Sequence, residues 1–538
     1  ANDVLADTVA ANVNGGTLNI ASFDETVAAV TLTNGAITGT TGRLNGASYA
    51  VNNGTGSTSI SAILAGSGQL TKSGAGTLTM SGANTYTGGT TINAGTLALG
   101  ANNVLADAGA VTVAGGTLDI VTFNDTVGTV TLSSGSITGT TGQLTSANYN
   151  VTNTTGATTI SAILAGSGQL TKTGAGALTL SGANTYTGAT AINAGVLSVT
   201  GSLSDSTAVT VASGATYNVD ASDTIASLAG SGVVSSSNAG LKTLTINNQQ
   251  SSGSFDGVIQ DGSGQLALTK LGTGTLNLLG ANTYTGLTTI DVGRIVFENN
   301  AMPATSGFAG AGSVVIQSAS NSFAANVTVT YTFASTLSAF TLGKTSNDVD
   351  VSLNSAIEIN GPVTIYGRNL NLNNNVNAGL LNAAAIFKAT SSIVLAANKT
   401  ITTNSGAITF NSDSDASGAG HIVINAGAGV YSNGGAITLG GGANPVTDYA
   451  VGAASGNKGV AIYQATISSG AGNIVINGKG FGSNGIYVEG NTSTNASPLS
   501  NASGFFNANS SFSKRMLVFS LQILASRILS LVGDLYKT

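Results

Sequence analysis

Short runs in which apolar residues alternate with Thr, Ser or Asn recur along most of the chain. Examples are Thr17–Ile20, Val30–Leu32, Leu78–Met80 and Thr96–Leu99. A period of two and an enrichment in β-branched residues are typical of strands with one buried face. Gly, Asn and Ser interrupt these runs at short intervals, which predicts turns. We therefore expect an all-β chain that consists of many short strands.

Two long segments of the chain are near copies of each other. Residues 58–88 and 158–188 differ at four of thirty-one positions and are related by a constant offset of 100 residues. A looser third copy runs from Gly262 to Phe297 and contains two additional residues. Repetition of this kind predicts a repeat architecture with three long repeats, at about 1–100, 101–200 and 201–300.

A different periodicity follows residue 300. Apolar triplets begin at Ile393, Ile408, Ile422 and Ile437, and the steps between them are 15, 14 and 15. We interpret residues 301–512 as a continuation of the same architecture with shorter coil repeats.

These patterns together favour a β-solenoid. A strand of four or five residues cannot bury its apolar face alone, whereas coils stacked ~4.8 Å apart form a continuous core. A string of β-sandwiches is the alternative, but the sequence contains no Pro-rich or charged linkers.

The final segment, 513–538, has a different pattern. It contains one Gly and no Asn. Its apolar residues recur at helical spacing and are Leu517, Leu521, Leu524, Ile528, Leu531 and Leu535. The spacing predicts an amphipathic helix. Such a helix could cap the open end of a solenoid or lie in a membrane interface. The segment could also be an artefact of a frameshift or of a chimeric sequence.

Composition excludes several classes of protein. The 538 residues include 75 Gly, four Pro, one His and no Cys, and only 7% are charged. Without Cys, neither a disulfide scaffold nor a thiolate zinc site can form. The net charge of −6 disfavours nucleic acid as a partner, because phosphates require clustered Lys and Arg.

One polar group recurs in all three long repeats and is a candidate surface contact. Its residues are Asn84, Tyr86, Asn184, Tyr186, Asn282 and Tyr284. Tyr is a frequent contact residue, and copies several coils apart would form a multivalent row. The alternative, which we favour, is that Asn forms a turn and Tyr packs on the coil.

Catalytic and metal-binding signals are incomplete. His421 is the only His and is expected in a turn before a strand. Asp413 and Asp415 resemble the start of a calcium loop, but Ile424 occupies the position of its essential Glu. Lys172 begins a Lys-Thr-Gly triplet whose Lys recurs in every long repeat, which indicates a structural role. We therefore predict no enzyme activity, no cofactor and no metal site.

The segment Gly66–Gly100, "GSGQLTKSGAGTLTMSGANTYTGGTTINAGTLALG", resembles the autotransporter-associated β-strand repeat of large bacterial surface proteins. Residues 390–490 are more similar to filamentous haemagglutinin-type adhesins. The resemblance implies a right-handed parallel β-helix that is exported across the periplasm and outer membrane of a Gram-negative bacterium. It also implies an outer-membrane translocator barrel outside this chain.

Proteins of this kind usually act in adhesion, aggregation or biofilm formation. The expected partners are a host or sister-cell surface, matrix or glycans. Two alternatives remain open at this point, a β-helical polysaccharide lyase or hydrolase and a self-assembling surface-layer or fibre protein. Clustered carboxylates with Lys and Arg on neighbouring coils would favour the enzyme.

Overall fold

The computed structural model describes residues 1–247, 252–300, 302–452, 458–481 and 485–489, and the backbone of 499–500 and 506–508. The chain divides into two compact units, unit 1 (Ala1–Thr288) and unit 2 (Thr289–Thr538). The helix expected at 513–538 lies outside the described residues. Among those that are described, no helix is long and apolar enough to cross a membrane.

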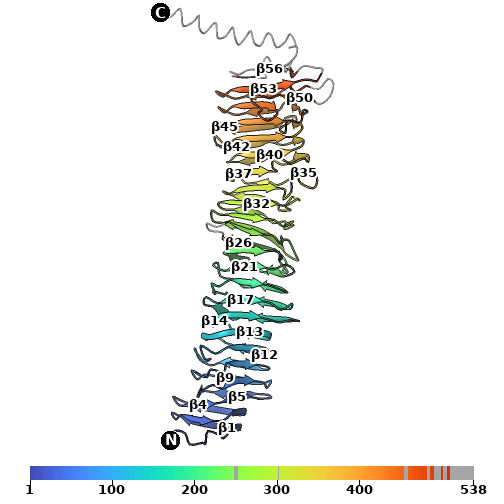
Figure 1. Cartoon of the computed structure of the whole chain (residues 1–538). Helices are drawn as coiled ribbons and strands as arrows, with labels where there is room; N and C mark the ends of the chain where they lie inside the picture. The colour runs from blue at the N-terminus through green and yellow to red at the C-terminus, as the bar shows by residue number, and fades with distance from the viewer. Residues whose placement is uncertain are drawn as a thin grey trace, which may run out of the picture. The chain divides into compact units, whose positions relative to one another are not determined.

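Unit 1 is a parallel β-solenoid, as the strand pattern predicts (Figure 1). Each strand pairs in parallel with the equivalent strand one coil later. Val30 pairs with Tyr49, Tyr49 with Leu70, Leu70 with Thr90, Thr90 with Val111 and Val111 with Val130. These five pairings lead from Val30 to its equivalent in the next long repeat, Val130, so one long repeat corresponds to five coils.

The core of unit 1 follows from the alternation within its strands. In β8 (Gln69–Lys72) and β9 (Thr77–Met80), every second side chain is buried. Leu78 of β9 pairs with Leu97 of β11 (Thr96–Leu99), and Leu97 pairs with Leu118 of β12 (Val111–Asp119). All three leucines are fully buried. Burial of one leucine side chain contributes ~2 kcal/mol, so inward columns of this kind hold the coils together.

Glycine permits a bend within the long strands of unit 1. Gly35, in β3 (Val30–Gly39), has a φ of +96°. A Cβ at this position would lie 1.9 Å from the carbonyl oxygen of Gly16 in β1 (Ala11–Ala21). No other residue type fits such a close approach of two backbones. The bend lets a single strand pass from one face of the solenoid to the next.

Unit 2 is also built from parallel coils. One of its sheets contains seven strands from successive coils. They are β35 (Val327–Val329), β38 (Val351–Leu353), β41 (Leu370–Leu372), β44 (Ile393–Leu395), β47 (Ile422–Ile424), β51 (Val460–Tyr463) and β54 (Ile486–Glu489). Its coils vary in length, because Val351 pairs with Leu370 whereas Ile422 pairs with the much more distant Val460.

The spacing of the apolar triplets after residue 300 is not the length of one coil, so the prediction of shorter coils is wrong for this segment. Ile393 of β44 pairs with Ile422 of β47, and Ile408 of β46 (Ile408–Ser412) pairs with Ile437 of β49 (Ile437–Gly441). Each pairing passes over the triplet that lies between its two partners in the sequence. The step from one triplet to the next therefore separates two strands of the same coil that belong to different sheets. The four triplets are strands, as expected, but each full coil takes two steps.

Candidate functional site

The repeated Asn and Tyr residues lie inside unit 1 and do not form a surface. Tyr86, Tyr186 and Tyr284 are at most 1% exposed, and Asn84, Asn184 and Asn282 are at most 5% exposed. The possible row of surface contacts is therefore wrong at these six positions, and the buried rings agree with the favoured alternative, that Tyr packs on the coil. The period-two alternation continues through this segment of the first two repeats and directs Asn and Tyr inward and the intervening Thr outward.

Each of these asparagines connects neighbouring coils through its amide group. The side-chain oxygen of Asn184 accepts the Leu164 N–H at 3.1 Å. Its amide nitrogen donates to the carbonyl oxygens of Gly182 at 2.9 Å and Ser202 at 3.0 Å. Asn84 makes the equivalent three bonds. A buried side chain with this many partners stabilises a turn that has no strand ladder.

The repeated lysines are buried structural groups as well. Lys72, Lys172 and Lys270 are fully buried in unit 1. The Lys72 ammonium donates to the carbonyl oxygens of Gly74 and, at 3.2 Å, of Ala94. Burial lowers the pKa of all three lysines. The lysine thus holds the turn carbonyls of two successive coils, which explains its recurrence without a catalytic role.

A carboxylate occupies an equivalent place in each of the three long repeats. Glu25 accepts the backbone N–H groups of Val4 and Leu5 at 2.9 and 2.8 Å. Oδ2 of Asp125 accepts those of Val104 and Leu105, both at 3.0 Å. The third repeat uses Asp223, which accepts the Leu203 N–H. Burial raises the pKa of Asp125 and of Asp223 to about 6.

The calcium-like segment of unit 2 has the geometry of a turn. Oδ1 of Asp413 accepts the Gly418 N–H at 2.9 Å, and Oδ1 of Asp415 accepts the Ser417 N–H at 3.3 Å. These contacts satisfy the carboxylates locally. Among the described residues, no three His, Asp or Glu side chains gather as metal ligands would.

The seven-stranded sheet of unit 2 has a column of polar residues that we call the edge ladder. Each member directly precedes the first inward residue of its strand, in five successive strands. These residues are Asn326, Asp350, Asn369, Ser392 and His421. Backbone bonds from Val327, Val351, Leu370 and Ile393 to the next ladder residue, at 2.8 to 2.9 Å, keep the five in line. The ladder is thus a consequence of coil stacking.

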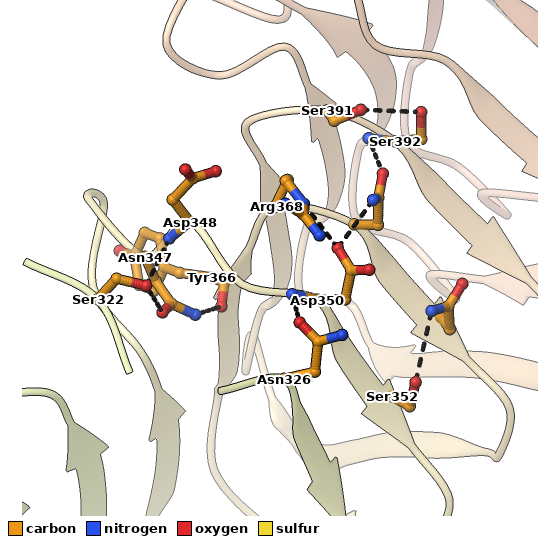
Figure 2. A network of polar contacts seen from close by, with 12 residues as sticks. Ser322, Asn326, Asn347, Asp348, Asp350, Ser352, Tyr366, Arg368, Ser391 and Ser392 are labelled. Atoms are coloured by element: carbon orange, nitrogen blue, oxygen red, sulfur yellow. Dashed lines mark hydrogen bonds and ion pairs between the residues drawn. The ribbon is translucent and has the colours of Figure 1, made fainter. Parts of the chain in front are cut away.

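Side-chain bonds connect each step of the edge ladder, and Figure 2 shows the steps from Asn326 to Ser392. Asn326 Oδ1 accepts the Asp350 N–H at 3.1 Å, and the Asn369 amide donates to Asp350 at 2.8 Å. Asn369 Oδ1 accepts the Ser392 N–H at 3.2 Å. Ser392 Oγ lies 2.9 Å from Nδ1 of His421. His421 is therefore half-buried and hydrogen-bonded, and burial lowers its pKa.

One ion pair joins the edge ladder. The Arg368 Nε donates to Asp350 Oδ1 at 2.9 Å, and Arg368 holds the pKa of that carboxyl below its usual value. The pair is partly exposed, so its contribution to stability is small. The Arg368 guanidinium neutralises the negative charge of Asp350 within the edge ladder.

Beside the ladder, the outward side chains of the same strands form what we call the outer face. Its first column is Thr328, Ser352, Asn371, Val394, Val423, Ala461 and Tyr487, of which Ala461 is buried. Its second column consists of the residues that directly follow the last inward residue in six of the strands. These are Asn354, Asn373, Ala396, Asn425, Tyr463 and Glu489. Hydroxyl and amide groups occupy the early coils, and aromatic rings the last two.

Two tyrosines of the outer face are in contact. The ring centroids of Tyr463 and Tyr487 lie 5.6 Å apart, with the planes inclined at 52°. The Lys458 ammonium lies 5.4 Å from the Tyr487 ring centroid, in a cation–π arrangement. Both rings are partly exposed. An aromatic pair that reaches solvent beside polar groups is typical of a contact surface.

The sequence pattern predicts neither the edge ladder nor the outer face. Their members come from coils of unequal length, so no constant spacing marks them. One local feature does mark several of these residues. They are polar residues or Tyr that lie next to an apolar triplet, so the positions of the triplets would locate them.

Comparison with known proteins agrees with the repeat pattern. The family model described as the passenger-associated-transport-repeat matches residues 70–99, 170–199 and 268–296. A curated relative, the "Adhesin BmaC autotransporter" of Brucella suis biovar 1 (strain 1330), is 32% identical over 218 aligned residues. That alignment covers 26% of this chain and 4% of the relative, so the chain spans a small part of that protein's length. No solved structure matches the chain significantly.

The matched segments coincide with the coils that contain the buried Lys and the inward Asn and Tyr. They begin at or near strands β8, β17 (Gln169–Lys172) and β29 (Gln265–Leu271). The family model thus describes residues that the fold needs. The repeats, the solenoid and the relative together support an autotransporter passenger repeat protein.

Proposed function

We propose that this chain is a segment of an adhesin-type passenger that acts at the bacterial surface or outside the cell, and that it has no catalytic activity. The three passenger-associated-transport repeats carry this proposal, because the family is described by its association with the transport of a passenger. The relative named as an adhesin supports the same conclusion. The solenoid would serve as a β-helical stalk that displays side chains along its coils.

The physical basis of adhesion would be many weak contacts. A solenoid repeats its outward side chains once per coil, at ~4.8 Å, so one coil's contact is reproduced on its neighbours. Repeated contacts on one scaffold raise the overall avidity well above the affinity of each one. With only 7% charged residues, these contacts would depend mainly on hydroxyl, amide and aromatic groups.

Adherence of coated particles tests the proposal. Beads carrying the purified chain would be incubated with epithelial cells, with immobilised matrix proteins and with sister bacteria, and bound beads would be counted. We expect adherence to at least one of these surfaces. The control is beads carrying the chain after thermal unfolding, at equal density. Equal adherence of folded and unfolded chain, or none of either, would contradict the proposal.

A further inference from the structure

We infer that the outer face of unit 2, together with the edge ladder, binds an extended, uncharged glycan chain that lies along the stacked coils. This inference rests on the proposed adhesive function and names the ligand class and the surface. Its evidence is the arrangement of hydrogen-bonding groups, aromatic rings and charges on a single sheet.

The hydrogen-bonding groups suit sugar hydroxyls. An amide side chain offers both donors and acceptors, as a sugar diol does, and a hydroxyl offers one donor and two acceptor sites. Asn354 and Asn373 are exposed on successive coils and bond to each other at 3.0 Å. Asn371 bonds to Ser352 at 3.4 Å. Each group keeps the capacity for further bonds, because a single contact does not saturate an amide.

The spacing of the groups suits a polymer. Seven strands at ~4.8 Å span about 29 Å, so the face can accommodate several consecutive sugars. Successive strands present equivalent positions in register, for example Ser352 beside Asn371 and Asn371 beside Val394. A ligand with its own short repeat would therefore meet a similar position at each step.

The two tyrosines supply the apolar part of the contact. The C–H groups on a pyranose ring face are apolar and pack against the electron-rich face of an aromatic ring. Because Tyr463 and Tyr487 lie on the neighbouring strands β51 and β54, with ring centroids 5.6 Å apart, they would contact successive sugars of a chain. In the first column, Val394 and Val423 lie between Asn371 and the coils of the tyrosines and keep the middle of this column uncharged.

The charges on this surface favour a neutral ligand. The Asp350 carboxylate is paired with Arg368, and Lys458 lies over Tyr487, whose strand also contains Glu489. With Asp348, which also acts on Arg368, this surface has no excess of basic charge, and its described part holds no cluster of basic groups for sulfates or carboxylates. An anionic glycan would need such a cluster.

Calorimetric titration of the full chain tests the inference. The probes are cellohexaose, chitohexaose and mannohexaose, with a heparin hexasaccharide as the anionic comparison. We expect saturable binding of at least one neutral hexasaccharide. The double variant Tyr463→Ala/Tyr487→Ala should bind it at least tenfold more weakly, and Tyr463→Phe/Tyr487→Phe, which keeps both rings, within threefold of the original chain.

Two further variants separate a binding role from a structural one. Asn354→Ala/Asn373→Ala removes exposed amides and should weaken binding severalfold at an unchanged unfolding midpoint. Thr71→Ala alters an outward residue of unit 1 and should leave affinity unchanged. Circular dichroism would establish that each variant is folded.

Several results would overturn the inference. They are the absence of saturation by every neutral probe, tighter binding of the heparin hexasaccharide, or unchanged affinity in the tyrosine-to-alanine variant. Self-association that this variant abolishes, without glycan binding, would assign the face to a second copy of the chain. If beads still adhere while no glycan binds, the adhesive function stands and only the glycan inference fails.

Discussion

The buried carboxylate Asp125 predicts a pH dependence of the stability of unit 1. Its side chain is 1% exposed, and Oδ2 accepts two backbone N–H groups from the preceding coil. Oδ1 has no hydrogen-bond partner among the described residues. Burial of this incompletely bonded carboxylate raises its pKa to about 6. The variant Asp125→Asn removes the charge and keeps a side-chain oxygen for the two N–H groups.

The sign of the effect follows from proton binding. The pKa of Asp125 is higher in the folded state than in the unfolded state. Between about pH 4 and pH 6, Asp125 is therefore protonated in the folded state and ionised in the unfolded state. The contribution of protonated Asp125 to the stability of unit 1 is complete below pH 4 and is lost as the pH rises through 6. A shift from 3.8 to about 6 corresponds to about 3 kcal/mol, because one pKa unit is worth ~1.4 kcal/mol.

Hydrogen exchange measures this effect locally. The opening free energy of the segment 100–110 would be determined between pH 4 and 7.5, with correction for the intrinsic exchange rate. We expect it to fall by about 3 kcal/mol in the original chain and to change much less in Asp125→Asn. Asp7→Asn, which alters an exposed carboxylate of the same unit, is the matched control and should retain the full decline.

An equal decline in Asp125→Asn and in the original chain would refute this reasoning. It would mean that the desolvation of Asp125 is fully compensated in the folded state. A decline confined to pH values above 6 would also contradict it, because the carboxyl is then already ionised in both states.

Substitutions at three other positions probe the structure of unit 1. Tyr186→Phe removes a hydroxyl that lies 2.6 Å from Thr190 Oγ1 and should cost about 1 kcal/mol, whereas Tyr186→Ala should cost about 4 kcal/mol because it leaves a cavity. Both are measured by urea unfolding, and equal costs would contradict the packing role. Asn184→Ala removes three hydrogen bonds, two of them between coils, and should destabilise unit 1 by about 3 kcal/mol; urea unfolding within 0.5 kcal/mol of the original, taken as about the spread of a surface substitution, would argue against this. Gly35→Ala places a Cβ against the Gly16 carbonyl and should cost at least about 2 kcal/mol, seen as a lower thermal midpoint; an unchanged midpoint would contradict the close approach.

Local pattern was sufficient to predict the fold class. Runs such as Leu78–Met80 and Ile422–Ile424 are strands in the structure because alternation with β-branched residues is a local property. The near identity of residues 58–88 and 158–188 predicted a stacked repeat, and stacking is what buries strands this short. The recurring Lys72, Lys172 and Lys270 were correctly assigned to the architecture, since a residue present in every repeat serves the repeat.

The sequence by itself determined that the chain is a stack of short strands, whereas only the tertiary structure decided which side chains face inward and which lie above one another. A period of two places Asn84 and Tyr86 on the same side but does not say which side is the core, and hydrogen bonds between coils offset the cost of burying Asn84. Likewise, Asn371 and Val394 became neighbours only through the pairing of coils whose lengths vary. Register between coils is a contact at long range, and no local pattern encodes it when loop lengths differ.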